Sequence, residues 1–87
     1  MKFFTKVLSS GTFTILGASG AQMLSVQANA SSECTFTGGI PFQGEVSEPI
    51  TLSNGEITTV SAASPSSPID GITVEWVSGT IDIIIGL

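Results

Sequence analysis

Seven carboxylates and one thiol are the side chains of this 87-residue sequence that are most able to carry chemistry. The sequence has no histidine, and Lys2 and Lys6 are its only basic residues. General acid–base catalysis near neutral pH relies most often on histidine, and a serine or cysteine nucleophile needs a neighbouring base. Two carboxylates can cleave a glycosidic bond, but they need a deep cleft that holds the sugar. The composition therefore predicts a protein that is not an enzyme and that uses no cofactor.

Glu75 and Asp82 are the pair of carboxylates that strand alternation could bring together. Residues 72–85 predict a hairpin, and a turn centred on Ser78 and Gly79 would place the two acids opposite each other. Because Ca²⁺ binds carboxylate oxygens, the pair could form half of a metal site. The sequence lacks the dense Asp and Asn run of dedicated calcium loops, so we favour two solvated carboxylates that discourage stacking on this face.

Cys34 is the only cysteine of the sequence, so it cannot form a disulfide within one chain. No cationic residue lies near it in the sequence to lower the pKa of its thiol. Two interpretations stay open. Cys34 could form an intermolecular disulfide near a mobile N-terminus, or it could be a buried thiol that packs as a small hydrophobic group beside Phe36.

Residues 1–30 have the pattern of a bacterial export signal. Two lysines lie near the start, residues 7–26 are uncharged, and Ala28 and Ala30 provide the small side chains that precede a cleavage site. We therefore predict a signal peptide that is cleaved after Ala30. An uncleaved membrane anchor is the alternative, although glycine and hydroxyl residues interrupt the apolar run.

Cleavage would remove 30 of the 87 residues and leave a domain of 57, residues 31–87. It would also remove both lysines, so the formal charge would change from −5 to −7. Such a surface repels phosphate backbones and anionic lipids, because binding to either depends on cationic side chains. We expect a secreted, periplasmic or cell-surface protein that binds neither nucleic acid nor, after cleavage, a membrane.

The region 31–87 is rich in isoleucine, valine and threonine, and such β-branched residues favour strands. Turn residues recur at the spacing expected of a small β fold. Residues 49–60 predict a hairpin, because Asn54 and Gly55 both tolerate the positive φ of a tight turn. The predicted fold is therefore all-β, a small antiparallel meander or partial sandwich that follows the signal peptide.

The hairpin predicted near residues 72–85 has one strongly apolar face. Six large side chains alternate onto that face: Ile72, Val74, Trp76, Ile81, Ile83 and Ile85. Ile84 adds an apolar group to the opposite face of the last strand. An uncovered apolar edge strand is a template for pairing with another chain. We therefore predict association through four residues of the C-terminal strand: Ile81, Ile83, Ile84 and Ile85.

Three functional hypotheses follow from these features. The first is a structural or interaction module that binds another copy or a larger secreted protein by strand addition. The second is a module that binds a small ligand or a carbohydrate with Trp76 as a stacking platform. The third is a fragment without a selected activity. The missing catalytic groups and the apolar C-terminal strand favour the first hypothesis.

Overall fold

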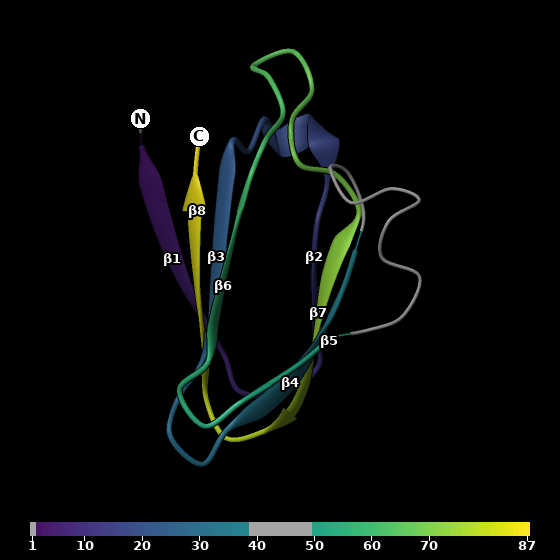
Figure 1. Ribbon diagram of the computed structural model, residues 1–87. Coiled ribbons are helices and arrows are strands. Elements are labelled where there is room, and N and C mark those ends of the chain that lie inside the picture. Colours follow the sequence, from purple (N-terminus) through teal and green to yellow (C-terminus); the bar gives the residue numbers. More distant parts are fainter. Residues whose placement is uncertain (1, 39–49) are drawn as a thin grey trace.

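Alternating β-branched and polar residues form eight strands in the computed structural model, which describes residues 2–38 and 50–87. The strands make two four-stranded antiparallel sheets that face each other (Figure 1). Sheet A has the order β1 (Phe3–Leu8), β8 (Ile81–Gly86), β3 (Met23–Ala28) and β6 (Ile57–Ser61). Sheet B has the order β2 (Thr12–Ile15), β7 (Ile72–Ser78), β4 (Glu33–Thr37) and β5 (Ile50–Ser53). The predicted all-β class is confirmed, and its architecture is a two-layer sandwich.

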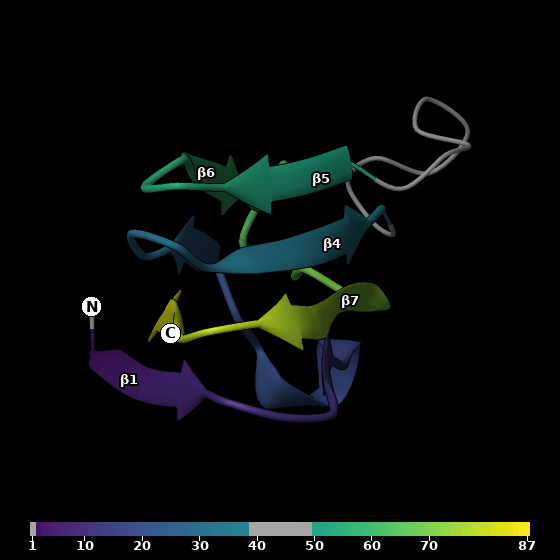
Figure 2. The same ribbon diagram turned by 90° about the horizontal axis from the view of Figure 1, so that it is seen from below.

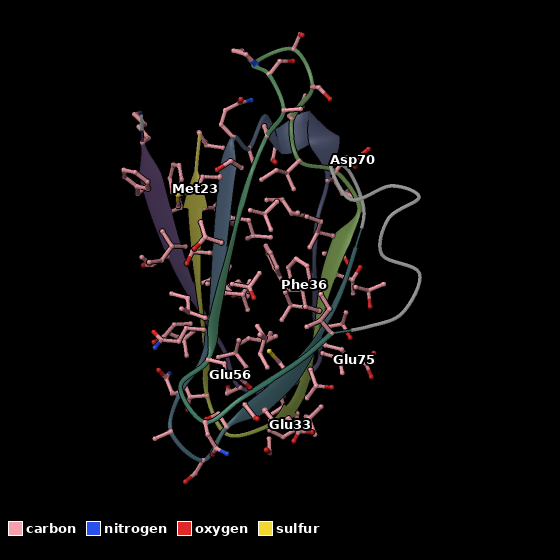
Figure 3. The ribbon with its side chains drawn as sticks, viewed as in Figure 1. Met23, Glu33, Phe36, Glu56, Asp70 and Glu75 are labelled. Carbon is pink, nitrogen blue, oxygen red and sulfur yellow. The ribbon has the colours of Figure 1, made fainter. Side chains whose placement is uncertain are left out.

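The core lies between the two sheets and follows the alternation of each strand (Figure 3). Phe36 of sheet B is fully buried and points into the space between the layers. Sheet A contributes Leu24, Val26, Ile81 and Ile83, none of which is exposed to solvent. The burial of one such aliphatic side chain contributes roughly 1.5–3 kcal/mol. The inner face of sheet A therefore depends equally on β3 and β8.

Consecutive strands lie in opposite sheets, except for β4 and β5. Figure 2 shows β4 and β5 side by side. The short 3-10 helix η1 (Gly17–Ser19) lies on the connection from β2 to β3 and is attached to Asp70, whose Oδ1 accepts a 2.7 Å hydrogen bond from the Gly17 N–H. Residues 3–28, most of the predicted signal peptide, form β1, β2, η1 and β3 in this 87-residue chain. Whether residues 1–30 are removed stays a prediction.

The predicted hairpins near residues 49–60 and 72–85 are wrong in their pairing, although each contains two strands. β5 pairs with β4 and β6 pairs with β3, while β7 and β8 also lie in different sheets. The Asn54-Gly55 turn does have positive φ at both residues. A tight turn reverses the chain, but the partners available to each strand decide whether the two strands share a ladder. Here β3 pairs with both β6 and β8.

Three turns meet at one end of the sandwich and connect its sheets. The backbone N–H of Asn54 donates to the Ser32 carbonyl at 3.1 Å, and the N–H of Asn29 donates to the Thr80 carbonyl at 3.1 Å. The Ser32 hydroxyl accepts a 2.8 Å bond from the Thr80 N–H. Gly79 lies against Ser32 so closely that a Cβ at this position would be 2.8 Å from the Ser32 Cα.

The close approach of Gly79 to Ser32 gives a test of this packing. Gly55 and Gly79 both have positive φ, but a Cβ on Gly55 would meet nothing within 4 Å. We expect Gly55→Ala to lower the free energy of unfolding by about 1–2 kcal/mol, the cost of a left-handed alanine. Gly79→Ala should cost about 1–3 kcal/mol more because of its clash with backbone. Urea unfolding of the full-length variants measures both, and equal losses would contradict the described contact.

Candidate functional site

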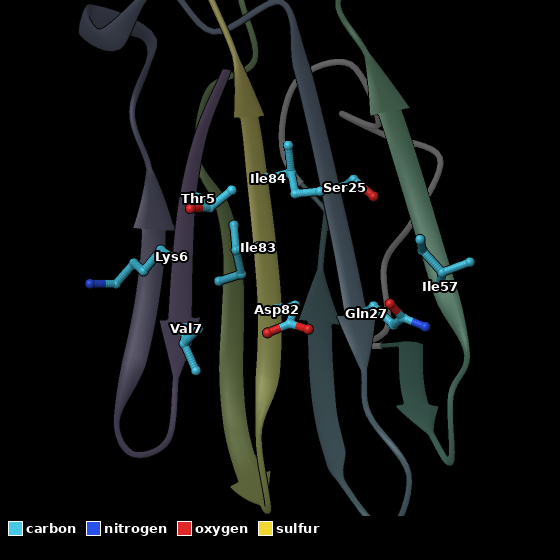
Figure 4. Close-up of a pocket in the computed structure, with 9 residues that line it drawn as sticks. All are labelled: Thr5, Lys6, Val7, Ser25, Gln27, Ile57, Asp82, Ile83 and Ile84. Carbon is cyan, nitrogen blue, oxygen red and sulfur yellow. The ribbon is translucent and has the colours of Figure 1, made fainter.

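A groove of about 260 Å³ lies on the outer face of sheet A (Figure 4). Strand register explains its shape, because one row of paired residues crosses all four strands: Val7, Asp82, Gln27 and Ile57. A neighbouring row contains Thr5, Ile84 and Ser25. The groove is lined by nine residues: Thr5, Lys6, Val7, Ser25, Gln27, Ile57, Asp82, Ile83 and Ile84.

The sides of the groove are apolar and its centre is polar. Val7 on one edge strand is 61% exposed, and Ile57 on the other edge strand is 58% exposed. Ser25, on the central strand β3, is only 8% exposed and accepts a 3.3 Å hydrogen bond from the Thr59 hydroxyl. Asp82 lies between the two edges and accepts a 3.1 Å bond from Asn29 Nδ2 at its Oδ2.

The cation of Lys6 is directed away from the groove, although this residue contributes to the lining (Figure 4). Its Nζ lies 6.0 Å from the centre of the Phe13 ring, which is within the range of a cation–π contact. The charge that the groove presents is therefore the carboxylate of Asp82.

The predicted pairing of Glu75 with Asp82 is wrong. Glu75 lies on β7 and is paired with Thr12 and Thr35 in sheet B, whereas Asp82 lies on β8 in sheet A. Both residues alternate with buried neighbours, so they point outward from opposite layers. Residues 2–38 and 50–87 contain no group of three Cys, Asp or Glu side chains that could hold a metal ion. The two carboxylates do not form half of a common metal site.

Trp76 lies outside the groove. It belongs to β7 of sheet B, where its partly buried ring packs against the core. Its indole N–H donates a 2.8 Å hydrogen bond to the carbonyl of Gly79, three residues further along the chain. The ring and its polar atom are thus both used within the fold, which does not favour Trp76 as a stacking platform.

Cys34 is fully buried on the inner face of β4. Burial raises the pKa of its thiol, and the neighbouring carboxylate of Glu33 raises it further. The structure agrees with the interpretation of a buried thiol near Phe36. An intermolecular disulfide would require this part of the full-length chain to open.

The C-terminal strand is not the uncovered edge that the sequence predicted. In the 87-residue chain β8 lies inside sheet A, with β1 on one side and β3 on the other. Ile81 and Ile83 are completely buried and Ile85 is partly buried, while Ile84 is 37% exposed on the outer face. The prediction overlooked the neighbours of β8 because both belong to residues 1–30.

The predicted cleavage site lies in the cluster of turns. Ala28 is fully buried at the end of β3, and Ala30 is exposed in the following turn. The backbone of Ala28 donates to the Glu56 carbonyl and accepts from the Gly55 N–H at 2.7 Å. Ser31, which follows the predicted cut, has a φ of 61°. The folded chain therefore holds this segment in a bonded turn rather than in an extended form.

Sequence reasoning missed most of the groove. Thr5, Val7, Ser25 and Gln27 belong to the predicted signal peptide and were not considered as part of a fold. Ile57 lies within the hairpin predicted near residues 49–60, where alternation with Leu52 favours an inward position, but the structure exposes it on the outer face of sheet A. Alternation in residues 3–8 and 23–28 was the available signal, but it identifies a groove only when the order of the strands is known.

The structure is that of a small all-β sandwich with a solvent-accessible, largely apolar groove on one face. Comparisons with protein-family models, curated proteins and solved structures found no match to this chain. In the part of the chain that the structure describes, no helix is long and apolar enough to cross a membrane.

The buried thiol of Cys34 gives a prediction about pH. Because folding raises the pKa of the thiol, the unfolded chain loses this proton first as the pH increases. The thiol therefore lowers the free energy of unfolding as the pH rises past its ordinary pKa of about 8.5. Urea unfolding should be measured from neutral pH to about pH 10. Over this range the free energy of unfolding should decline less for Cys34→Ala than for the unsubstituted chain. Parallel declines would contradict the burial of this thiol.

The bonded turn at Ala30 predicts that folding protects the cleavage site. Purified full-length chain should resist signal peptidase in detergent when folded, and it should be cut after Ala30 when kept unfolded in mild urea that the peptidase tolerates. Mass spectrometry of the products identifies the cut. Equal cleavage of both forms would show that the turn gives no protection, whereas cleavage of neither form would contradict the predicted signal peptide.

Proposed function

We propose that this chain is the precursor of an exported interaction module that self-associates through β8 once residues 1–30 are removed. The module acts outside the cytoplasm as a secreted, periplasmic or cell-surface protein. It has a binding role and no catalytic one, because the sequence has no histidine and offers no base for its thiol.

The observation that carries the proposal is the position of β8. Both of its hydrogen-bonded neighbours, β1 and β3, come from residues 3–28. Cleavage after Ala30 would therefore leave two unpaired edges on a strand of four isoleucines, one aspartate and one glycine. Unpaired backbone donors and acceptors on an apolar strand favour pairing with another chain.

The loss of β3 would also open the core. Leu24 and Val26 are fully buried, and together they contribute roughly 3–6 kcal/mol by burial. Small domains have a total stability of about 5–15 kcal/mol. The loss of β3 would therefore strongly destabilise the processed chain unless another strand takes its place. Association through β8 would supply hydrogen bonds to the backbone of this strand and would cover its isoleucine side chains.

A second copy of the chain fits the exposed edge of β8. Two copies of this strand can pair antiparallel about a two-fold axis, which makes the interface self-complementary. With Ile83 on the axis, Asp82 of one copy lies opposite Ile84 of the other. This register keeps the two aspartates from facing each other directly, an arrangement that would be unfavourable.

Removal of β1 alone provides the sharpest test. A chain of residues 10–87 keeps β3 and loses only Leu8 from the buried core. We expect the chain of residues 1–87 to be monomeric, and the 10–87 and 31–87 chains to form dimers or larger assemblies. Size-exclusion chromatography with light scattering measures the mass of each.

A competing peptide distinguishes pairing at β8 from unspecific aggregation. A synthetic peptide of residues 2–9 should restore the 10–87 chain to a monomer by occupying the place of β1. The same peptide with Thr5→Pro and Lys6→Pro should not, because adjacent N–H groups point to opposite edges and one of them must face β8. A 10–87 chain that stays monomeric would rule out self-association through this edge and leave a different protein as the partner.

A further inference from the structure

We propose that the groove on the outer face of sheet A binds an alkylammonium ion, with the ammonium group at Asp82 and the alkyl chain against Val7 and Ile84. The site belongs to the chain that retains residues 1–30, because Thr5 and Val7 lie on β1. The inference is therefore independent of self-association by the processed chain.

The volume of the groove and its apolar lining residues indicate the apolar part of the ligand. The groove measures about 260 Å³, slightly below the range of about 300–1,000 Å³ that is usual for drug-sized ligands. Val7, Ile57 and Ile84 are all substantially exposed in the free protein. A short alkyl chain that starts at Asp82 and lies against Val7 and Ile84 would remove apolar surface from water, at about 25 cal/mol for each Å² buried.

The polar atoms of the groove decide the charged part of the ligand. The Asp82 carboxylate offers only acceptors, and the bond from Asn29 uses one of its two oxygens. The Gln27 side chain donates its Nε2 to the Gly55 carbonyl at 3.4 Å, which leaves its amide oxygen as an acceptor. Acceptors beside a negative charge match a group that donates several hydrogen bonds and carries a positive charge, as an ammonium does.

No cation of the groove lining competes for this place. Lys6 is the only basic residue of the lining, and its side chain leads away from the groove (Figure 4). The formal charge of −5 adds a long-range attraction for cations and disfavours carboxylate ligands. These observations together favour an amine over an alcohol or an acid with the same alkyl chain.

Three ligands of matched shape test the proposal on the full-length chain. Hexylammonium, hexanol and hexanoate are titrated separately into ¹⁵N-labelled protein at neutral pH, and amide shifts are followed by NMR. We expect hexylammonium to shift the amides of Ser25, Gln27 and Asp82, with a Kd at least tenfold lower than that of hexanol. Hexanoate should be the weakest ligand. Equal binding of the amine and the alcohol would overturn the proposal.

Two substitutions that each remove one negative charge distinguish binding at this site from the general attraction between a cation and an acidic protein. Asp82→Asn should weaken hexylammonium binding to the level of hexanol, whereas Glu75→Gln, on the outer face of sheet B, should leave it within twofold. Val7→Ser should weaken both the amine and the alcohol. A loss as large for Glu75→Gln as for Asp82→Asn would overturn the site. Amide shifts of the core residues verify that each variant is folded.

Discussion

The pairing of β3 with both β8 and β6 is the constraint on which the sandwich depends. β3 is an inner strand of sheet A, and it contributes two ladders together with fully buried Leu24, Val26 and Ala28. Without it, β8 and β6 have no common neighbour in their sheet. Their places would then rest on the turns that connect each of them to sheet B. A strand near the start of the chain therefore determines how the end of the chain is packed.

The hydrogen bonds within the cluster of turns fix the position of one sheet relative to the other. The carbonyls of Ala28 and Ser32 accept bonds from the turn at Asn54 and Gly55, and the Ser32 hydroxyl accepts one from Thr80. Each bond joins segments that are distant in sequence. Asn29 links this cluster to the groove, because its side chain donates to Asp82. Turn geometry and the position of the groove carboxylate are thus coupled.

The two outer faces differ in chemistry because alternation gives each strand one inward and one outward set of residues. Sheet B exposes a row of Thr12, Glu75, Thr35 and Thr51, which is hydroxyl-rich. Sheet A exposes Val7, Ile57 and Ile84 around one carboxylate. Exposed apolar patches mark interaction surfaces, which is why the proposed ligand is placed on the outer face of sheet A.

Sequence patterns alone determined the all-β class and the inward faces of the last two strands, β7 and β8, because a period of two is a local property of each strand. They placed Ile57 of β6 on the wrong face, since that side chain is exposed on the outside of sheet A. The same patterns place Ile81 and Ile83 correctly on a buried face. Only the tertiary structure decided that β5 and β6, and β7 and β8, lie in different sheets, and that Glu75 and Asp82 point away from each other. It alone also placed Asp82 in one row with Val7, Gln27 and Ile57. Those relations depend on which strands are neighbours, and the choice of neighbours is a competition across the whole chain that no local pattern records.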